Sequence, residues 1–74
     1  QIEFISTEIG DLVKLKELNL GYNQIKLMPK DIGNLLELKI LCLNGNQITT
    51  IPIEIGNLIN LKHLYIKENP IEFP

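Results

Sequence analysis

A unit of 23 residues recurs along this chain and limits the folds open to it. Shifting the sequence by 23 positions lays residues 15–37 on residues 38–60, and 12 of the 23 positions are then identical. The shared positions read L-K-x-L-x-L-x-x-N-Q-I and then P-x-x-I-G-N-L. We therefore expect one repetitive domain of 74 residues, with a partial repeat (1–14), two whole repeats (15–37 and 38–60) and a second partial repeat (61–74).

Each unit contains one short stretch in which apolar and variable residues alternate. The alternating apolar pairs are Leu18 and Leu20, Leu41 and Leu43, and Leu64 and Ile66. A period of two predicts a short strand with one buried face, and 23 residues between equivalent strands leave room for a parallel crossover. Pro29 and Pro52 are expected in the first turn of a short helix, where a missing N–H costs nothing. Asp31 and Glu54 follow in the same turn, where the helix dipole favours an anion.

An asparagine recurs at one position of the unit, as Asn23, Asn46 and Asn69. The whole pattern resembles the leucine-rich repeat family in its 23-residue typical or bacterial form, over essentially the whole chain. The resemblance implies an α/β solenoid, with a short parallel sheet on the concave side and short helices or turns on the convex side. It also implies a structural ladder in which each asparagine bonds backbone groups of its own and the neighbouring coil. Two positions depart from the pattern. Ser6 stands where the two whole repeats have Pro29 and Pro52, and Pro74 comes one place before the position that the repeat predicts for a proline.

The composition argues against several classes of function. The net charge is −2 and all seven basic residues are lysines, so nucleic acid is a poor partner. No apolar run is long enough to span a membrane, and the glycines form no phosphate-binding G-x-x-x-x-G-K loop. The single cysteine, Cys42, excludes an intramolecular disulfide, and with the single histidine it cannot form a structural zinc site. We expect no cofactor and no metal ion.

Cys42 and His63 are predicted to be diagonal neighbours on adjacent strands. Such a pair can act as a nucleophile and a base. The sequence offers no second histidine, no pocket-forming insertion and no helix N-terminus to activate the thiol. Asp31 and Glu54 lie one repeat apart on the solvated outer side and do not read as an acid–base pair. We therefore predict that the chain is not an enzyme, with cross-linking of two chains through Cys42 as a minor alternative.

The residues that the repeat does not require form the candidate binding face. Parallel strands about 4.8 Å apart bring these variable positions into contact. An exposed Ile40 flanked by Cys42 and Tyr65 has the mixed character of a partner-binding surface, although single exposed apolar residues are ordinary. The predicted protein-binding residues are Glu17, Asn19, Tyr22, Ile40, Cys42, Asn44, His63, Tyr65 and Lys67. The adjacent row of Lys16, Lys39 and Lys62 is interpreted as a solvated edge.

The family resemblance implies a non-catalytic protein–protein interaction module that binds a partner of unknown identity on the concave sheet. The alternative is a self-assembling structural segment that forms a homo-oligomer through its open solenoid ends. This alternative rests on apolar residues at the two ends, namely Ile2, Phe4, Ile5, Ile71 and Phe73. The sequence is compatible with either a secreted or a cytoplasmic protein.

Overall fold

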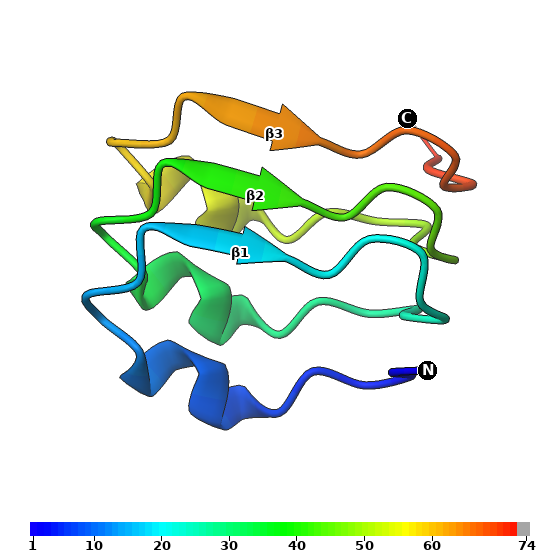
Figure 1. The fold of residues 1–74 in the computed structure, drawn as a ribbon, viewed down its shortest axis with the longest axis horizontal. Helices are drawn as coiled ribbons and strands as arrows, with labels where there is room; N and C mark the ends of the chain where they lie inside the picture. Colours follow the sequence, from blue (N-terminus) through cyan, green and yellow to red (C-terminus); the bar gives the residue numbers. More distant parts are fainter. Residues whose placement is uncertain (73–74) are drawn as a thin grey trace.

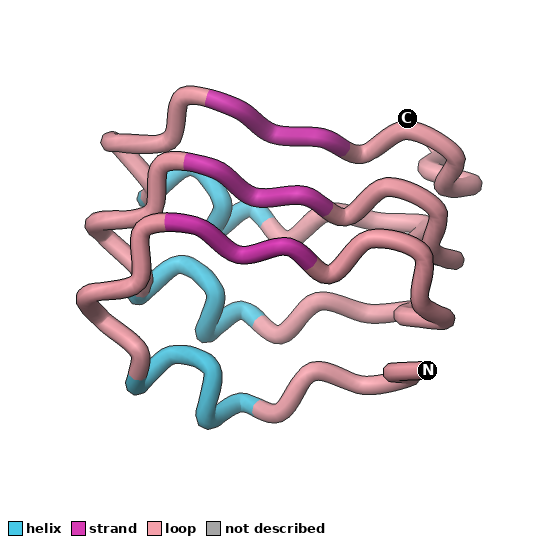
Figure 2. Tube along the Cα trace, in the orientation of Figure 1, coloured by secondary structure: helices cyan, strands magenta, loops and turns pink. Residues whose placement is uncertain are grey.

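The computed structural model describes residues 1–72, so Phe73 and Pro74 lie outside the described residues. Each coil of the chain consists of one short 3₁₀ helix followed by one short strand (Figure 1). The elements in chain order are η1 (Thr7–Asp11), β1 (Glu17–Asn19), η2 (Lys30–Asn34), β2 (Ile40–Cys42), η3 (Ile53–Asn57) and β3 (His63–Tyr65). Figure 2 shows the strands side by side on one face and the helices on the opposite face, which confirms the predicted solenoid.

The strands form one open parallel sheet in the order β1-β2-β3. Residues 23 positions apart are register partners, so that Leu18 lies opposite Leu41 and Leu41 opposite Leu64. Paired residues on adjacent strands are therefore separated by one repeat length, and the predicted parallel pairing is confirmed. Leu64 is nevertheless 36% exposed, because β3 is an edge strand covered on one side only.

The helices differ from expectation at their proline positions. Pro29 and Pro52 precede η2 and η3 as extended N-cap residues with φ of −70° and −64°, and the prediction that they lie within the first turn is wrong. The fixed proline φ also suits an extended residue, and the proline carbonyl still accepts the first helical hydrogen bond, from Ile32 N to Pro29 O at 3.2 Å. In the first coil Ser6 occupies this position, and its hydroxyl accepts a hydrogen bond from the backbone N–H of Glu8 at 3.1 Å.

The core lies between the sheet and the helices and is densest in the coil that contains β2. Leu38, Leu41 and Leu43 are fully buried there. Leu18, the partner of Leu41 on β1, is only half-buried. The buried apolar residues are Ile25, Met28, Ile32, Leu35, Leu38, Leu41, Leu43, Ile48 and Leu58. All nine lie within residues 15–60. Burial of each large aliphatic side chain contributes about 1.5–3 kcal/mol, so the two whole repeats supply most of the hydrophobic stabilisation.

The recurring asparagines connect adjacent coils. Asn46 is 6% exposed, and its side-chain oxygen accepts a hydrogen bond from the backbone N–H of Ile25 at 3.0 Å. Its side-chain nitrogen donates to the carbonyls of Leu43 at 2.9 Å and Leu20 at 3.0 Å. Each amide therefore bonds its own coil and the preceding coil, which satisfies backbone groups that no strand or helix pairs.

Candidate functional site

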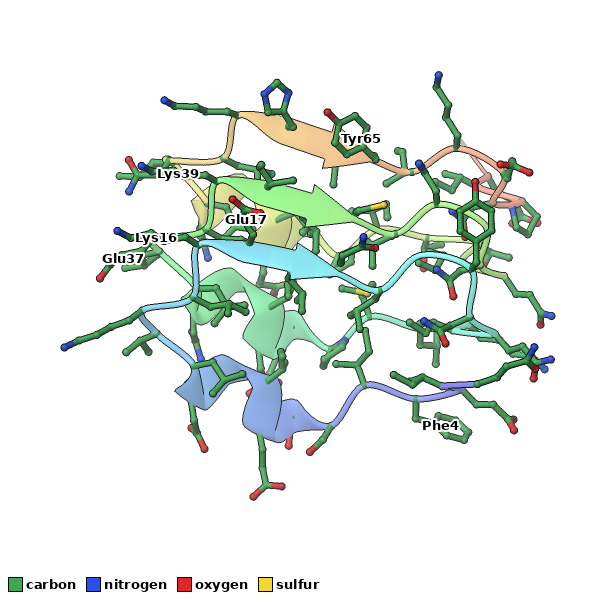
Figure 3. The ribbon with its side chains drawn as sticks, viewed as in Figure 1. Phe4, Lys16, Glu17, Glu37, Lys39 and Tyr65 are labelled. Carbon is green, nitrogen blue, oxygen red and sulfur yellow. The ribbon has the colours of Figure 1, made fainter. Side chains whose placement is uncertain are left out.

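The face of the sheet that points away from the helices is the predicted concave face. It carries two rows of variable side chains that lie side by side because of the strand register. The first row is Glu17, Ile40 and His63. The second row is Asn19, Cys42 and Tyr65. Alternation along each strand places both rows on the same face, two residues apart. Figure 3 shows Glu17 on β1 and Tyr65 on β3, both projecting from this face.

The middle strand of this face is less accessible than the sequence indicated. Ile40 and Cys42 are half-buried, and the expectation of an exposed Ile40 is wrong. The reason is that β2 is flanked by β1 and β3, whose side chains cover both sides of each β2 residue. The edge-strand Tyr65 remains 42% exposed. The accessible side chains of this face therefore belong to β1 and β3. The half-buried Ile40 and Cys42 of β2 lie between them, and we call these two residues the apolar floor.

An open pocket of about 340 Å³ lies over this floor. It is lined by Glu17, Leu18, Asn19, Ile40, Cys42, Asn44 and Tyr65. Leu18 was not among the predicted site residues, because the alternation assigned it to the core; its half-buried position on an edge strand brings it to the pocket. The remaining predicted residues, Tyr22, His63 and Lys67, lie outside this lining. The pocket thus combines aliphatic side chains, a thiol, carboxamides, a carboxylate and an aromatic ring.

Two aromatic rings on β3 pack against each other at one side of the face. The rings of His63 and Tyr65 are parallel to within 6°, with centroids 5.9 Å apart. This stacking restricts the rotamers of both side chains before any partner arrives. The imidazole is consequently oriented by an aromatic neighbour on the same strand.

A third row, Gly21, Asn44 and Lys67, follows the strands, and the carboxamides of Asn19 and Asn44 bond backbone N–H groups of this row. The side-chain oxygen of Asn44 accepts from the backbone N–H of Lys67 at 2.7 Å, across the gap between two coils. The side-chain oxygen of Asn19 accepts from the backbone N–H of Gly21 at 3.0 Å, within one coil. Both carboxamides are therefore fixed in orientation, and they form a rigid polar border to the apolar floor.

Beyond this border, a tyrosine reaches across two coils. Tyr22, Gly45 and Glu68 occupy the same repeat position, and all three have a left-handed backbone with φ of 58°, 69° and 59°. Gly45 has no side chain, and an added Cβ would collide with the Tyr22 ring that lies over it. The Tyr22 hydroxyl consequently reaches Glu68 and donates a hydrogen bond to its Oε1 at 3.1 Å. This hydrogen bond, together with the carboxylate charge, raises the pKa of Tyr22 above its ordinary value.

The contact between Tyr22 and Glu68 was only partly visible in the sequence. Tyr22 was a predicted site residue and Glu68 was not. The signal that could have found the pair is Gly45, at the equivalent position of the coil between them. A missing side chain in the middle of three equivalent positions leaves room for the outer two residues to meet.

Three further features of the described residues concern metal ligands, the thiol and membrane-spanning helices. Within residues 1–72 no group of three His, Cys, Asp or Glu side chains is placed to share a metal ion. The one cysteine, Cys42, is a half-buried free thiol. Over the same range, no helix has both the length and the apolar character that crossing a lipid bilayer requires.

Comparison with protein families gives a match to a leucine-rich repeat region over residues 3–74. No curated protein sequence matches the chain. Among solved structures, a leucine-rich repeat protein of Leptospira interrogans superposes with a TM-score of 0.90 at 29% identity, over 97% of this chain and 24% of that chain.

Two plant receptors are also similar in structure. The leucine-rich repeat ectodomain of the membrane receptor kinase GASSHO1/SCHENGEN3 of Arabidopsis thaliana, solved with CASPARIAN STRIP INTEGRITY FACTOR 2, has a TM-score of 0.84 at 30% identity. The peptide hormone receptor RGFR1, solved with RGF2, has a TM-score of 0.84 at 33% identity. The match covers 90% of this chain in both cases, but only 8% and 11% of the receptor chains. The chain therefore spans a small part of the solved proteins it resembles.

Proposed function

The chain belongs to the leucine-rich repeat family, and from this premise we propose that it is a non-catalytic protein-recognition module whose partner binds on the concave sheet face. Proteins of this family and fold are generally binding modules without enzymatic activity. The two plant receptors were each solved in complex with another molecule, which supports a recognition role for the shared fold.

The observation that carries the proposal is the pocket over the middle of the sheet. Its floor is formed by Ile40 and Cys42, and the exposed ring of Tyr65 stands at one side. A partly desolvated apolar floor with an aromatic residue beside it is the usual composition of an energetic centre in protein interfaces. The fixed carboxamides of Asn19 and Asn44 supply directional contacts around it, at little cost in side-chain entropy.

The size of the pocket favours one or two side chains of an extended peptide or loop over a small molecule. A volume of about 340 Å³ lies at the lower end of the range for small-molecule sites, and this pocket is open to solvent. A protein partner would bury the pocket together with the surrounding rows. The predicted site residues of the first and second rows would then form the centre of the interface, with Tyr22 and Lys67 at its rim.

Selection from a displayed library of random peptides on the immobilised chain tests this proposal. We expect selected peptides to lose binding to Ile40→Glu and Tyr65→Ala, because these changes charge the floor and remove the aromatic ring. Lys26→Glu, an exposed change away from the sheet, should leave their binding within about twofold. Circular dichroism of all three variants should match that of the unmodified chain.

Equal loss of binding in the Lys26→Glu variant would move the interface away from the concave face. Self-association through the solenoid ends, the alternative function, stays a prediction. Static light scattering over a dilution series tests it, and a monomer mass that persists at high concentration would exclude it.

A further inference from the structure

Each coil passes from its helix to its strand through a tight turn. The turns are closed by hydrogen bonds from Leu15 N to Leu12 O, Leu38 N to Leu35 O and Leu61 N to Leu58 O, each at 3.0 Å. The two central residues of each turn form the corner of the coil. These corner pairs are Val13 with Lys14, Leu36 with Glu37, and Ile59 with Asn60.

The first corner residue is aliphatic in every coil and exposed in every coil. Val13 and Leu36 are 52% exposed, and Ile59 is 84% exposed. Such turns favour Gly, Pro, Asn, Asp and Ser, and the second corner position varies freely among Lys, Glu and Asn. Turn geometry therefore does not explain the three aliphatic side chains. We call Val13, Leu36 and Ile59 the corner stripe.

The corner stripe follows the stacking of the coils, and one hydrogen bond ties two of its three corners together. Adjacent coils are about 4.8 Å apart, so three equivalent residues form a row of about 10 Å along the solenoid. The side-chain nitrogen of Asn60 donates a hydrogen bond to the carbonyl of Leu36 at 2.8 Å, which ties two successive corners together. A single exposed apolar residue needs no explanation, but an exposed aliphatic residue repeated at one position of all three coils is a candidate interaction surface.

A row of lysines runs parallel to the corner stripe, three residues later in each coil. Lys16, Lys39 and Lys62 are all exposed. Backbone hydrogen bonds from Lys39 N to Lys16 O and from Lys62 N to Lys39 O, both at 2.8 Å, keep them adjacent. Figure 3 shows Lys16 and Lys39 pointing outward at the edge where the coils enter the sheet, with Glu37 at the same edge. Together with Lys14 at the corner beside Val13, four of the seven lysines of a chain with net charge −2 are thus concentrated at one edge.

From the stripe and the lysine row together we propose that this edge binds an amphipathic helix with an acidic flank, supplied by a protein partner. The pitch of an α-helix, about 5.4 Å, is close to the spacing of the coils. A helix lying along the solenoid would therefore set one aliphatic residue per turn against each corner residue. Its Asp or Glu residues, one turn apart, would face the successive lysines. This surface is separate from the concave face and does not depend on the function proposed for it.

The charge pattern favours a helix over an anionic lipid surface. The second corner position holds Glu37 beside Leu36 and Lys14 beside Val13, so both signs of charge occur along this edge. A flat anionic surface would repel the Glu37 carboxylate, since it presents negative charge everywhere. A helix presents its acidic residues on one flank only, so that it meets the lysines and leaves Glu37 to solvent.

A synthetic helical peptide provides a direct test on the full 74-residue chain. The probe has roughly 18 residues, with leucines at the i, i+4, i+7 positions of one face and glutamates along one flank. Fluorescence anisotropy of the labelled peptide measures its affinity. We expect Leu36→Asn to weaken binding about fivefold, as the loss of a half-exposed leucine contact implies. The matched control, Leu27→Asn, alters a leucine that is 66% exposed elsewhere and should change affinity by less than about twofold.

The lysine row is tested in the same assay. Lys39→Gln should weaken binding of the peptide and reduce its dependence on salt, whereas Lys26→Gln should do neither, because exposed charge pairs are screened by ions. A companion peptide with glutamine in place of glutamate should bind the unmodified chain and Lys39→Gln equally weakly. Far-UV circular dichroism checks that every variant is folded.

Three results would overturn the proposal. The first is the absence of saturable binding of the glutamate peptide. The second is an equal loss of affinity in Leu36→Asn and Leu27→Asn. The third is binding to vesicles of phosphatidylserine and phosphatidylcholine that depends on Leu36 and Lys39 while the peptide does not bind, which would identify a lipid surface instead.

Discussion

Replacement of Asn46 by alanine should destabilise the solenoid by about 1–3 kcal/mol, because one buried backbone N–H loses its partner. The carbonyls that Asn46 bonds have a second donor, since Leu20 O also accepts from Asn23 at 3.0 Å and Leu43 O from Asn69 at 2.8 Å. The N–H of Ile25, a fully buried residue, is different, because its partner is the side-chain oxygen of Asn46 at 3.0 Å. The cost therefore comes from one orphaned donor.

The matched control is Asn23→Ala in the preceding coil. Its side-chain oxygen accepts from the N–H of Ile2 at 2.9 Å, but Ile2 is 44% exposed, so water can replace the lost acceptor. We expect this variant to lose less than about 1 kcal/mol. Urea unfolding followed by far-UV circular dichroism measures both free energies of unfolding. A chain of 74 residues has a total stability of roughly 4–11 kcal/mol, so the predicted difference is readily resolved.

The comparison refutes the reasoning if Asn46→Ala is as stable as Asn23→Ala. The amide of the middle coil would then contribute no more than a solvated one. A change in the m-value of either variant would point to a different unfolded or native state, and the free energies would not be comparable.

Three further predictions concern the core and the left-handed positions. Leu41→Ala should cost about 2–5 kcal/mol in the same urea assay, since Leu41 is fully buried and its loss leaves a cavity; a cost below about 1 kcal/mol would contradict the packing. Gly45→Ala should cost about 1–2 kcal/mol for its left-handed backbone and also displace the Tyr22 ring, which is measured as lost nuclear Overhauser contacts of that ring; unchanged contacts would argue against the arrangement. Tyr22 should ionise above the ordinary tyrosine pKa of 10.0 in an absorbance titration of the Tyr65→Phe variant, where it is the remaining tyrosine, and Glu68→Gln should lower that pKa. The neutral hydroxyl donates to the carboxylate, so this contribution to stability is present below pH 10 and is lost as the pH rises through the raised pKa of the folded chain; a titration unaffected by Glu68→Gln would contradict it.

The repeat predicted the architecture because the same 23-residue spacing governs both sequence and sheet. Leu18, Leu41 and Leu64 are equivalent in the alignment and are register partners in the sheet. Their burial could not be predicted in the same way, because it depends on how many neighbouring coils cover each one. Leu41 is fully buried, whereas Leu64 is 36% exposed. The periodicity therefore predicts the pairing of equivalent residues but not the exposed fraction of each side chain.

The details of the candidate site were harder to predict for the same reason. Ile40 was expected to be exposed by its alternation, but the side chains of two flanking strands cover it. The pairing of Tyr22 with Glu68 depends on a glycine in a coil that neither residue belongs to. Alternation along one strand contains no information about neighbours in different coils. Comparing the equivalent positions of successive repeats does indicate which side chains are neighbours, as for Val13, Leu36 and Ile59.

The bond between Tyr22 and Glu68 also affects how the solenoid can open. The asparagine bonds to the preceding coil, such as Asn46 to Ile25, join residues 21 positions apart, so they couple nearest neighbours. Repeat proteins with such coupling behave as one-dimensional chains, in which a coil can unfold once it detaches from the next. Tyr22 and Glu68 are 46 positions apart and link coils that are not neighbours. Detachment of the coil that contains β3 must therefore also break a contact with the coil of β1, which makes local opening more cooperative than nearest-neighbour coupling alone would allow.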